Sequence, residues 1–340
     1  NKNYFGELID TFGGIDDIEK GIIKTPTDPD KTFSDDPLRM LRAIRFSCEL
    51  NFDIDMNTQN SIKKNSNRLE ILSSERISDE INKILMSETP SNGFKNLEKL
   101  NLLNHVLPEL IDLKGVEEVE GQTHKDNFYH TLEVVDNISR NTENVWLRWA
   151  ALLHDIGKAP TKKFSKKIGW TFHGHEFIGS KMVKKIFTRL SLPLNEKLKY
   201  VQKIVMMSSR PIIISEDIVT DSAVRRLIYD AGDDIDDLLT LCEADITTKN
   251  MKKSLIYQNN FKIVRQKIKD VEERDSIRNF QPPITGEIIM AYFNIKPCKE
   301  IGLIKEKIKN AILDGDIRND YKEAHHLMIK TGKSLGLKDE

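Results

Sequence analysis

Four residues of the types that bind divalent metals are spread over the middle of the chain: His130, His154, Asp155 and Asp245. His154 and Asp155 are adjacent in "LRWAALLHDIGK", so both can approach one metal from the end of an apolar helix. His130 belongs to a separate expected helix. Asp245 lies in the apolar run "LLTLCEADI", where burial of an unpaired carboxylate would be costly and a metal would satisfy it. Imidazole and carboxylate ligands together suit Mn²⁺, Fe, Ni²⁺, Co²⁺ or Zn²⁺.

The order H…HD…D resembles the pattern of HD phosphohydrolase domains, and this chain matches it completely. The resemblance implies that His175, in "FHGHEFIGSKMV", could contribute to a second metal, whereas His173 is interpreted as part of a surface loop. A metal-bound water would attack a phosphoester, with Asp155 as ligand and candidate base and Lys158 neutralising a phosphate oxygen. The alternative is that the domain keeps the motif as a scaffold and binds RNA.

A second group of interest lies in "SDDPLRMLRAIRF", which places Asp36, Arg39, Arg42 and Arg45 at intervals of three. Asp36 can cap a helix, with the following proline in the first turn. One interpretation is therefore a capped amphipathic helix with intrahelical ion pairs. The other starts from hydrogen bonding, because a carboxylate only accepts and a guanidinium only donates. Asp36 and Arg39 would present an acceptor beside a donor, which matches adenine and cytosine and rejects uracil and guanine.

Several segments, in order, resemble the class II tRNA nucleotidyltransferases, the family of CCA-adding enzymes and bacterial poly(A) polymerases. "LIDTFGGIDDIEKGIIKT" resembles the segment that closes the family's catalytic head. "DDPLRMLRAIRF" resembles its nucleobase-reading helix, with Asp35 in place of the usual first glutamate. "SSERISDEINKIL", "SNGFKNLEKLNLLNHVLPEL" and residues 282–320 continue the resemblance, which covers nearly the whole chain.

The resemblance implies roles for the residues of the reading helix. Asp36 and Arg39 would face the incoming base of ATP or CTP, whereas Arg42 and Arg45 would brace that pair or approach phosphates. Arg76, on the next helix, could hold the reading helix in place. The implied partners are tRNA, ATP and CTP.

The carboxylates for nucleotidyl transfer are not recognisable in the sequence. The reaction needs acidic residues that hold two Mg²⁺ ions, which the family supplies from a DxD pair on a strand of the head. "NFDID" (51–55) has these letters but follows the reading helix and is interpreted as a loop. We therefore expect the Mg²⁺ ligands upstream of Asn1, and expect the chain as given to bind a nucleotide weakly without adding one.

Apolar periodicity predicts a mostly α fold from residue 35 onward, preceded by a short strand at "GIIKT". Helices are expected over 35–50, 56–67, 74–87, 91–101, 128–141, 145–157, 174–190, 196–208, 217–231, 234–247, 253–275, 285–293, 299–314 and 319–335. Four segments are expected: an α/β remnant of the nucleotidyltransferase head (1–34), a helical neck and body (35–115), an α-helical HD domain (116–270) and a helical tail (271–340).

Composition narrows the functional class. The 340 residues carry a net charge of −1 and a mean hydropathy of −0.46, so RNA binding would depend on local basic clusters. Such clusters lie at 158–167, 181–189 and 305–310, and the loop "KKFSKK" beside the predicted metal site is the best candidate. Three widely spaced cysteines fit a reducing cytosol, and no apolar run is long enough to span a membrane.

These observations favour part of a tRNA nucleotidyltransferase that adds CCA, or part of it, to tRNA 3′ ends, with an HD domain that could bind metal and hydrolyse phosphoesters. Two alternatives remain open. One is a metal-dependent HD phosphohydrolase that acts on RNA ends or nucleotides, and the other is a non-catalytic tRNA-binding module. The sequence does not indicate an oligomeric state.

Overall fold

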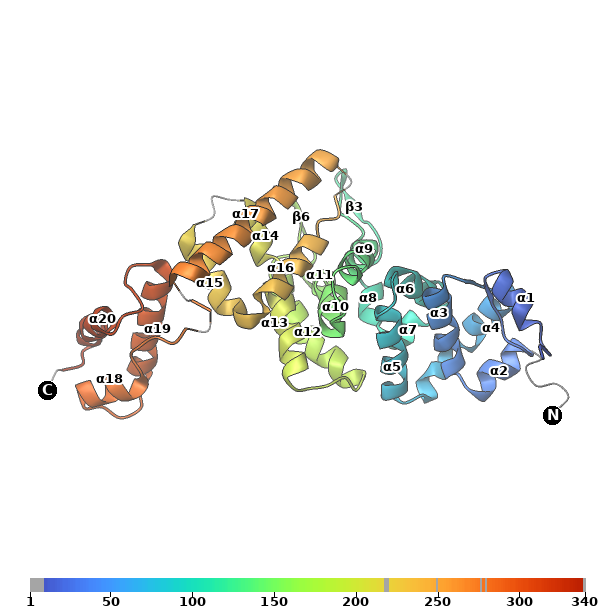
Figure 1. The fold of residues 1–340 in the computed structure, drawn as a ribbon, viewed down its shortest axis with the longest axis horizontal. Coiled ribbons are helices and arrows are strands. Elements are labelled where there is room, and N and C mark those ends of the chain that lie inside the picture. Colours follow the sequence, from blue (N-terminus) through green and yellow to red (C-terminus); the bar gives the residue numbers. More distant parts are fainter. Residues whose placement is uncertain (1–8, 217–219, 249, 276, 279, 339–340) are drawn as a thin grey trace. The chain divides into compact units, whose positions relative to one another are not determined.

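The computed structural model describes residues 9–216, 220–248, 250–275, 277–278 and 280–338, and its fold is mostly helical (Figure 1). This confirms the predicted fold class. The chain forms two compact units, one made of residues 1–209 and 240–249 and the other of 210–239 and 250–340. This division is coarser than the four expected segments, whose boundaries stay predictions. None of the described helices is long and apolar enough to cross a membrane.

The first unit begins with a short α/β arrangement and continues as helices. Its helices are α1 (Gly14–Glu19), α2 (Pro29–Asp35), α3 (Leu38–Leu50), α4 (Met56–Asn65), α5 (Ser74–Leu85), α6 (Pro90–Lys99), α7 (Leu103–Val106), α8 (Pro108–Ile111), α9 (Asn127–Ser139), α10 (Val145–Leu153), α11 (Lys158–Thr161), α12 (His175–Arg189) and α13 (Glu196–Met207), with the 3-10 helix η2 (Ser66–Ile71). Its strands are β1 (Ile22–Ile23), β2 (Asp53–Ile54), β3 (Glu118–Val119), β4 (Gln122–Thr123), β5 (Lys163–Ser165) and β6 (Gly169–Thr171).

The expected remnant at 1–34 is described from residue 9, and residues 1–8 lie outside the described part. The short strand predicted at "GIIKT" is β1, which pairs in parallel with β2, the strand that follows α3 in the sequence. Gly21, at φ +66°, makes the turn into β1 and packs against Phe52. The segment before α3 is therefore fastened to the segment that follows it.

Helix α3 buries the face that the sequence predicted, with Met40, Leu41, Ile44 and Cys48 turned inward. This face packs against α5 and α6. The helix begins at Leu38, one residue later than a cap at Asp36 predicts. The Asp36 carboxylate nevertheless accepts a hydrogen bond from the Leu38 backbone N–H over 3.2 Å, so it still satisfies a free amide at the helix start.

Helices α9, α10, α12 and α13 form the core of the region expected to be an HD domain. Helix α10 packs against both α9 and α13, and α12 packs along α13. Trp149 and Phe187 are fully buried between them, with ring centroids 6.1 Å apart. Helix α10 is apolar over nearly its whole length, which fits an element covered on all sides.

Two antiparallel hairpins in this unit were not predicted. Strands β3 and β4 pair across the turn at Glu120–Gly121, and β5 pairs with β6. The indole N–H of Trp170 donates to the carbonyl oxygen of Gln122, which fastens one hairpin to the other. The strands have only two or three residues each, too few for an alternating pattern to be recognised.

The second unit consists of helices, of which α17 is the longest (Figure 1). They are α14 (Arg210–Glu216), α15 (Asp221–Ala231), the 3-10 helix η3 (Gly232–Asp234), α17 (Met251–Asp275), α18 (Gly286–Phe293), α19 (Lys299–Asp314) and α20 (Tyr321–Ser334), and α16 (Ile235–Ala244) contributes residues to both units. Helix α14 was missed, and the helix predicted over 217–231 begins at Asp221, with 217–219 outside the described residues.

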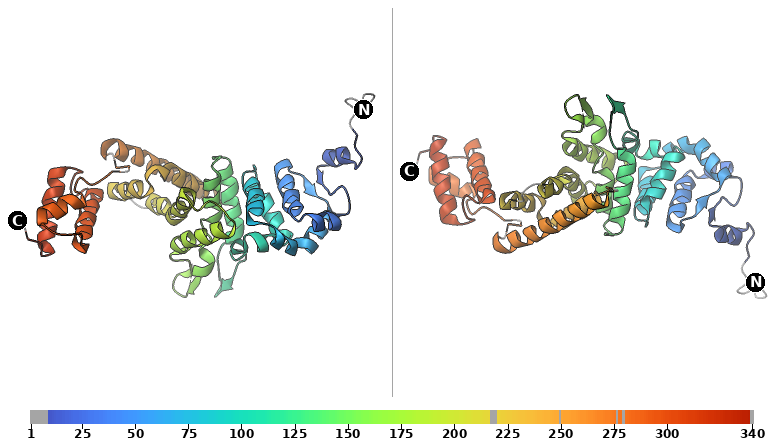
Figure 2. Two further views of the ribbon diagram at one scale, coloured as in Figure 1. Left: turned by 90° about the horizontal axis from the view of Figure 1, so that it is seen from below. Right: turned by 90° about the horizontal axis from the view of Figure 1, so that it is seen from above.

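The core of the second unit lies where α17 packs against α14 and α15. Phe261, Val264, Ile268 and Val271 form the buried stripe of α17. Helices α18, α19 and α20 pack together at the end of this unit, as Figure 2 shows. Gly332 on α20 faces the ring of Phe293 on α18, and any side chain at position 332 would collide with that ring.

Candidate functional site

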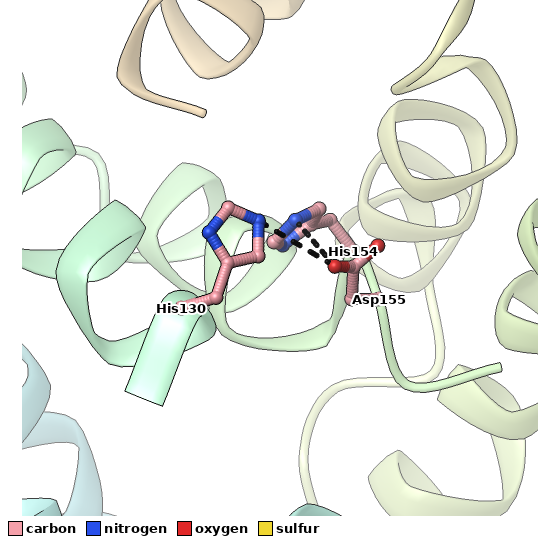
Figure 3. Close-up of side chains that lie close together, drawn as sticks. All are labelled: His130, His154 and Asp155. Carbon is pink, nitrogen blue, oxygen red and sulfur yellow. Dashed lines mark ion pairs between the residues drawn. The ribbon is translucent and has the colours of Figure 1, made fainter. Parts of the chain in front are cut away.

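The four residues of the H…HD…D pattern come together in the first unit, where three elements end or begin. His130 lies in the first turn of α9, whose start is fixed by Asp126, because that carboxylate caps two backbone amides. His154 and Asp155 directly follow the last residue of α10. Their side chains lie close to that of His130 (Figure 3). Asp245 follows α16, and the side-chain amide of Asn137 on α9 donates to the carbonyl oxygen of Ala244 over 3.0 Å. That hydrogen bond holds Asp245 beside His130.

The distances describe a compact cluster. The ligand atoms of His130, His154 and Asp155 all lie within 4.8 Å of one another, and all three residues are buried. Asp245 Oδ1 contacts both imidazoles of this cluster and lies 2.8 Å from His130 Nε2 and 3.6 Å from His154 Nε2. Asp155 Oδ2 lies 3.4 Å from His154 Nε2 and 3.6 Å from His130 Nε2. Two carboxylates thus converge with two imidazole nitrogens, and His130 Nε2 and Asp245 Oδ1 are in direct contact.

The second nitrogen of each histidine is held by another group. His154 Nδ1 lies 2.8 Å from the Ala151 carbonyl oxygen and His175 Nδ1 lies 3.0 Å from the Phe172 carbonyl oxygen. A carbonyl only accepts, so each Nδ1 carries the proton and leaves a lone pair on Nε2 in the neutral ring. His130 Nδ1 lies 3.0 Å from Thr247 Oγ1, which can accept in the same way. Metal-binding histidines are commonly oriented by such second contacts.

The cluster contains buried polar atoms whose contacts are ion pairs with one another. His154 Nε2 and Asp245 Oδ1 are inaccessible to water and, in the described part of the chain, meet only the other members of the cluster, the shortest contact being 2.8 Å between Asp245 Oδ1 and His130 Nε2. When His154 is neutral, its Nε2 is a buried acceptor without a donor, which is costly, and a divalent cation would satisfy that lone pair and the neighbouring carboxylate oxygens together. The donor set of imidazoles and carboxylates fits the predicted transition metals.

Electrostatics in the protein alone keep the cluster charged. Burial would lower the pKa of His154, but the nearby Asp155 and Asp245 carboxylates outweigh it and raise that pKa to about 10. Burial would raise the pKa of Asp155, but His154, Lys158 and His130 hold it well below its usual range. The imidazolium therefore compensates the carboxylates, a task that a metal would take over when bound.

Two lysines border the cluster, and the sequence predicted only one of them. Lys158 Nζ lies 2.6 Å from Asp155 Oδ2, so the residue expected to neutralise phosphate contacts a candidate ligand. Lys125 was missed. Its Nζ lies 2.8 Å from His130 Nδ1 and contacts Thr247 Oγ1, and burial lowers its pKa. If Lys125 donates a hydrogen bond to His130 Nδ1, the proton of the neutral ring lies on Nε2, which then cannot bind a metal. Metal binding by Nε2 therefore requires His130 Nδ1 to carry the proton and to donate it to Thr247 Oγ1 instead.

His175 lies at the start of α12, with Nε2 3.7 Å from Asp155 Oδ1. Gly157 makes this approach possible, because a Cβ there would meet the His175 carbonyl oxygen at 2.1 Å and the Gly179 amide nitrogen at 2.7 Å. The turn after Asp155 and the first turn of α12 are therefore in backbone contact. His173 is exposed, as the loop interpretation expects.

The residues predicted on the reading helix divide into two groups. Arg39 and Arg42 are exposed and line a cavity of about 260 Å³, which also has Phe33 and Phe46 in its wall. Arg45 is held elsewhere, with Nε 2.7 Å from Glu80 and Nη1 2.7 Å from Glu49. Its guanidinium also lies 4.0 Å from the centroid of the Phe46 ring. These contacts fasten Arg45 to Glu49 on α3 and to Glu80 on α5, whereas its predicted role toward a nucleotide stays a prediction.

Asp36 is placed by the neighbouring helix. Its carboxylate pairs with Arg76 on α5 at 3.4 Å, and both side chains are partly exposed. Asp36 is not among the lining residues of the cavity beside Arg39. The predicted contact of Arg76 with the reading helix is present, whereas the joint presentation of Asp36 and Arg39 to a base stays a prediction.

The basic loop beside the metal cluster is partly neutralised. Lys162 pairs with Glu117 at 2.9 Å, and Lys166 lies 3.6 Å from Glu120 on the β3–β4 hairpin. Lys163 and Lys167 are exposed. RNA binding by this loop stays a prediction.

The chain matches two family models. One, described as a probable RNA and SrmB-binding site of polymerase A, covers residues 51–113, and the HD domain model covers residues 127–250. An A-adding tRNA nucleotidyltransferase from Deinococcus radiodurans is 27% identical over 319 residues, which are 91% of this chain and 71% of that protein. A multifunctional CCA protein from Shewanella frigidimarina is 36% identical over 195 residues, 55% of this chain and 45% of the relative. The match therefore spans less than half of that relative.

Solved structures agree on the fold. The Bacillus stearothermophilus CCA-adding enzyme in complex with CTP has a TM-score of 0.61 and 18% identity, with 98% of this chain and 71% of that chain covered. The Thermotoga maritima CCA-adding enzyme in complex with tRNA has a TM-score of 0.51 and 21% identity, with 96% and 68% covered.

Fold and site together define a class of helical proteins in which RNA-binding helices of the polymerase A type precede an HD domain. Within this class, the chain belongs to the CCA-adding tRNA nucleotidyltransferase family with an HD domain.

Proposed function

We propose that this chain is the base-selecting and RNA-holding part of an enzyme that adds CCA, or part of it, to the 3′ ends of tRNA. The observation that supports this most is helix α3. It exposes Arg39 and Arg42 beside a cavity with aromatic walls, in a chain similar to enzymes described as CCA-adding and A-adding. The Mg²⁺ ions of the transfer reaction would be held by residues outside this chain.

Base selection would use Asp36 as the hydrogen-bond acceptor and Arg39 as the hydrogen-bond donor toward the incoming base. A carboxylate accepts a hydrogen bond from the exocyclic amine of adenine or cytosine, and a guanidinium donates a hydrogen bond to the neighbouring ring nitrogen. The ion pair of Asp36 with Arg76 is long and partly exposed, so it is weak enough for a base to compete with it. The proposed partners of the enzyme are therefore tRNA, ATP and CTP.

The test uses the full-length protein, tRNA that lacks its 3′-terminal nucleotides, and each of the four ribonucleoside triphosphates. Arg39→Ala should lose about 1–3 kcal/mol of preference for ATP and CTP over UTP and GTP, roughly 5- to 150-fold. Arg140→Ala, an exposed arginine at the end of α9, is the matched control. Unchanged selectivity in Arg39→Ala would show that Asp36 and Arg39 do not select the base.

We propose a second function, metal-dependent phosphoester hydrolysis at the HD cluster. The supporting observation is the buried convergence of ligand atoms from His130, His154 and Asp155, all within 4.8 Å of one another, with Asp245 Oδ1 3.6 Å from His154 Nε2. His130, His154, Asp155 and Asp245 would hold a divalent transition metal, and His175 could join them. A metal bound there would supply Lewis-acid activation of a water molecule.

The chain's own residues have separate tasks in this reaction. Asp155 would take a proton from the attacking water through its second oxygen, Oδ1, which lies 3.7 Å from His175 Nε2. Lys158 would neutralise a phosphate oxygen once its contact with Asp155 is relaxed. The buried surroundings of His154 and Asp155 strengthen these electrostatic interactions.

The hydrolysis test combines metal analysis with an activity assay. The protein is loaded with Mn²⁺, Ni²⁺ or Co²⁺, its metal content is measured, and it is assayed with p-nitrophenyl phosphate and a 2′,3′-cyclic nucleotide. His154→Ala should lose metal and hydrolysis, whereas His173→Ala, which changes an exposed histidine in the nearby loop, should keep both. Hydrolysis that persists in Asp155→Ala would reject the cluster as an active site. Metal binding without hydrolysis would instead favour the scaffold alternative.

A further inference from the structure

The second unit contains a cavity of about 370 Å³ that neither proposed activity uses. It lies between α15, the end of α17 and the turn that follows α19. Its lining includes Arg225, Arg274, Asp275, Ile312, Gly315, Ile317, Arg318 and Asn319. Its volume falls in the range of pockets that bind small ligands.

Arg225 supplies the most buried cation of this cavity, with a side chain that is 15% exposed. Its Nε donates to Asp275 Oδ2 over 2.7 Å. Its two terminal nitrogens have no hydrogen-bond partner among the described residues. Unpaired guanidinium donors in a half-buried position indicate that a ligand acceptor is missing.

Asp275 holds two guanidinium groups in place at once. Besides Arg225, it accepts from Arg274 Nε over 2.8 Å and from Arg274 Nη2 over 2.9 Å. One carboxylate therefore orients two arginines. Arg318 adds a third cation at the exposed rim, where its backbone N–H is fixed by Glu323. Asp221, outside the lining, also pairs with Arg274 at 2.8 Å, so the net positive charge of the cavity comes from three arginines against Asp275 and Asp221.

The rest of the wall suits the non-ionic part of a ligand. Ile312 is 3% exposed and Ile317 is half-buried, so both can contact an apolar or planar group. Asn319 adds an amide that can donate or accept. A site with paired guanidinium groups beside an apolar wall matches a phosphate that is attached to a sugar and a base.

Gly315 keeps the cavity open for the guanidinium of Arg225. It has φ +82°, and a Cβ there would meet Arg225 Nη1 at 2.7 Å. Any other residue would be strained and would displace the arginine.

We propose that this cavity binds the phosphate group of a nucleotide, either a free mononucleotide or one nucleotide of an RNA strand. The site is independent of the HD cluster and of the reading helix, so it does not depend on the activities proposed above. It would give the second unit a defined ligand, fixed by Arg225 from the inside and by the exposed Arg274 and Arg318 at the rim.

The test measures binding of inorganic phosphate and AMP to the whole chain by calorimetry, and binding of tRNA with and without AMP as competitor. Arg225→Gln should weaken AMP binding by about tenfold or more. Arg318→Gln, which changes an exposed residue and should not affect folding, should weaken AMP binding severalfold. Arg226→Gln is the matched control, because Arg226 pairs with Asp314 and does not line the cavity.

The ligand source follows from which binding changes. Loss of AMP and phosphate binding in Arg225→Gln and Arg318→Gln supports a free-nucleotide site. Loss of tRNA affinity alone, in the same two variants, supports a nucleotide within an RNA strand. If neither variant changes either affinity, or if Arg226→Gln changes it equally, the proposal is wrong.

Discussion

Arg148 Nη1 donates a hydrogen bond to the carbonyl oxygen of Leu85 over 3.0 Å, which links α10 to the last residue of α5. The same guanidinium donates to the carbonyl oxygens of Ser87, Ser139 and Thr142. These acceptors lie at the C-terminal ends of α5 and α9, where helix carbonyls lack intrahelical partners and a cation is favourable. One buried arginine thus caps two helices and joins the polymerase-A-type helices to the HD domain.

Replacement of Arg148 by methionine should destabilise the first unit by about 3 kcal/mol or more, because several buried carbonyls lose their donor together. All three tryptophans, at positions 146, 149 and 170, belong to this unit, so tryptophan fluorescence in a urea titration follows it selectively. Arg140→Met, at an exposed position, should leave the midpoint nearly unchanged. A midpoint shift of equal size in both variants would mean that Arg148 has no special role.

Gly157→Ala should disrupt the HD cluster without removing any candidate ligand. The new methyl group would collide with the backbone of α12 at His175 and Gly179, so the start of α12 must move away from Asp155. Overpacking of this kind typically costs about 1–3 kcal/mol. The variant should show a lower urea midpoint and weaker metal binding by calorimetry. Gly302→Ala, at a helical position with open space around it, should be neutral or slightly stabilising.

Much of this architecture follows from local sequence patterns. The helices from α3 to α20 that carry apolar periodicity were expected within a few residues of their observed bounds, because burial of one face leaves a strong signal. His130, His154, Asp155 and Asp245 were recognised by type and order. Their supporting contacts were not predictable. Thr247 and Lys125 meet His130 only through the tertiary fold, and no spacing in the sequence indicates such a contact.

The reading helix illustrates the same limit. Its capping acid and its buried face follow from propensity and periodicity, so both could be predicted. Whether an arginine at a spacing of three faces solvent or a neighbour depends on the next helix. Glu80 on α5 takes Arg45 away from the surface, whereas Arg39 stays exposed, and a single sequence contains no signal for that difference.

Arg45 and Arg76 both fasten α3 to α5, but they should contribute very differently to stability. Arg45→Met leaves Glu80, which is 4% exposed, with only Lys83 as a cationic partner among the described residues, and should cost about 3 kcal/mol. Arg76→Met removes a long, partly exposed ion pair and should cost less than about 1 kcal/mol. Urea midpoints from tryptophan fluorescence would compare them. Equal costs would contradict the assigned roles.

The arginine-rich cavity of the second unit should make that unit sensitive to acid. Hydrogen bonds from Arg274, with a further one from Arg225, lower the pKa of Asp275 from 3.8 to about 2, although burial opposes the shift. Because the folded-state pKa is below the unfolded value, the stabilisation is complete above about pH 4 and is lost as the pH falls toward 2. Thermal unfolding followed by circular dichroism should therefore show an acid-induced loss of helix in the second unit, which contains no tryptophan. Asp275→Asn should be less stable near neutral pH and should show a smaller further loss between pH 4 and 2. An acid sensitivity as steep as that of the unaltered protein would show that Asp275 is not the group responsible.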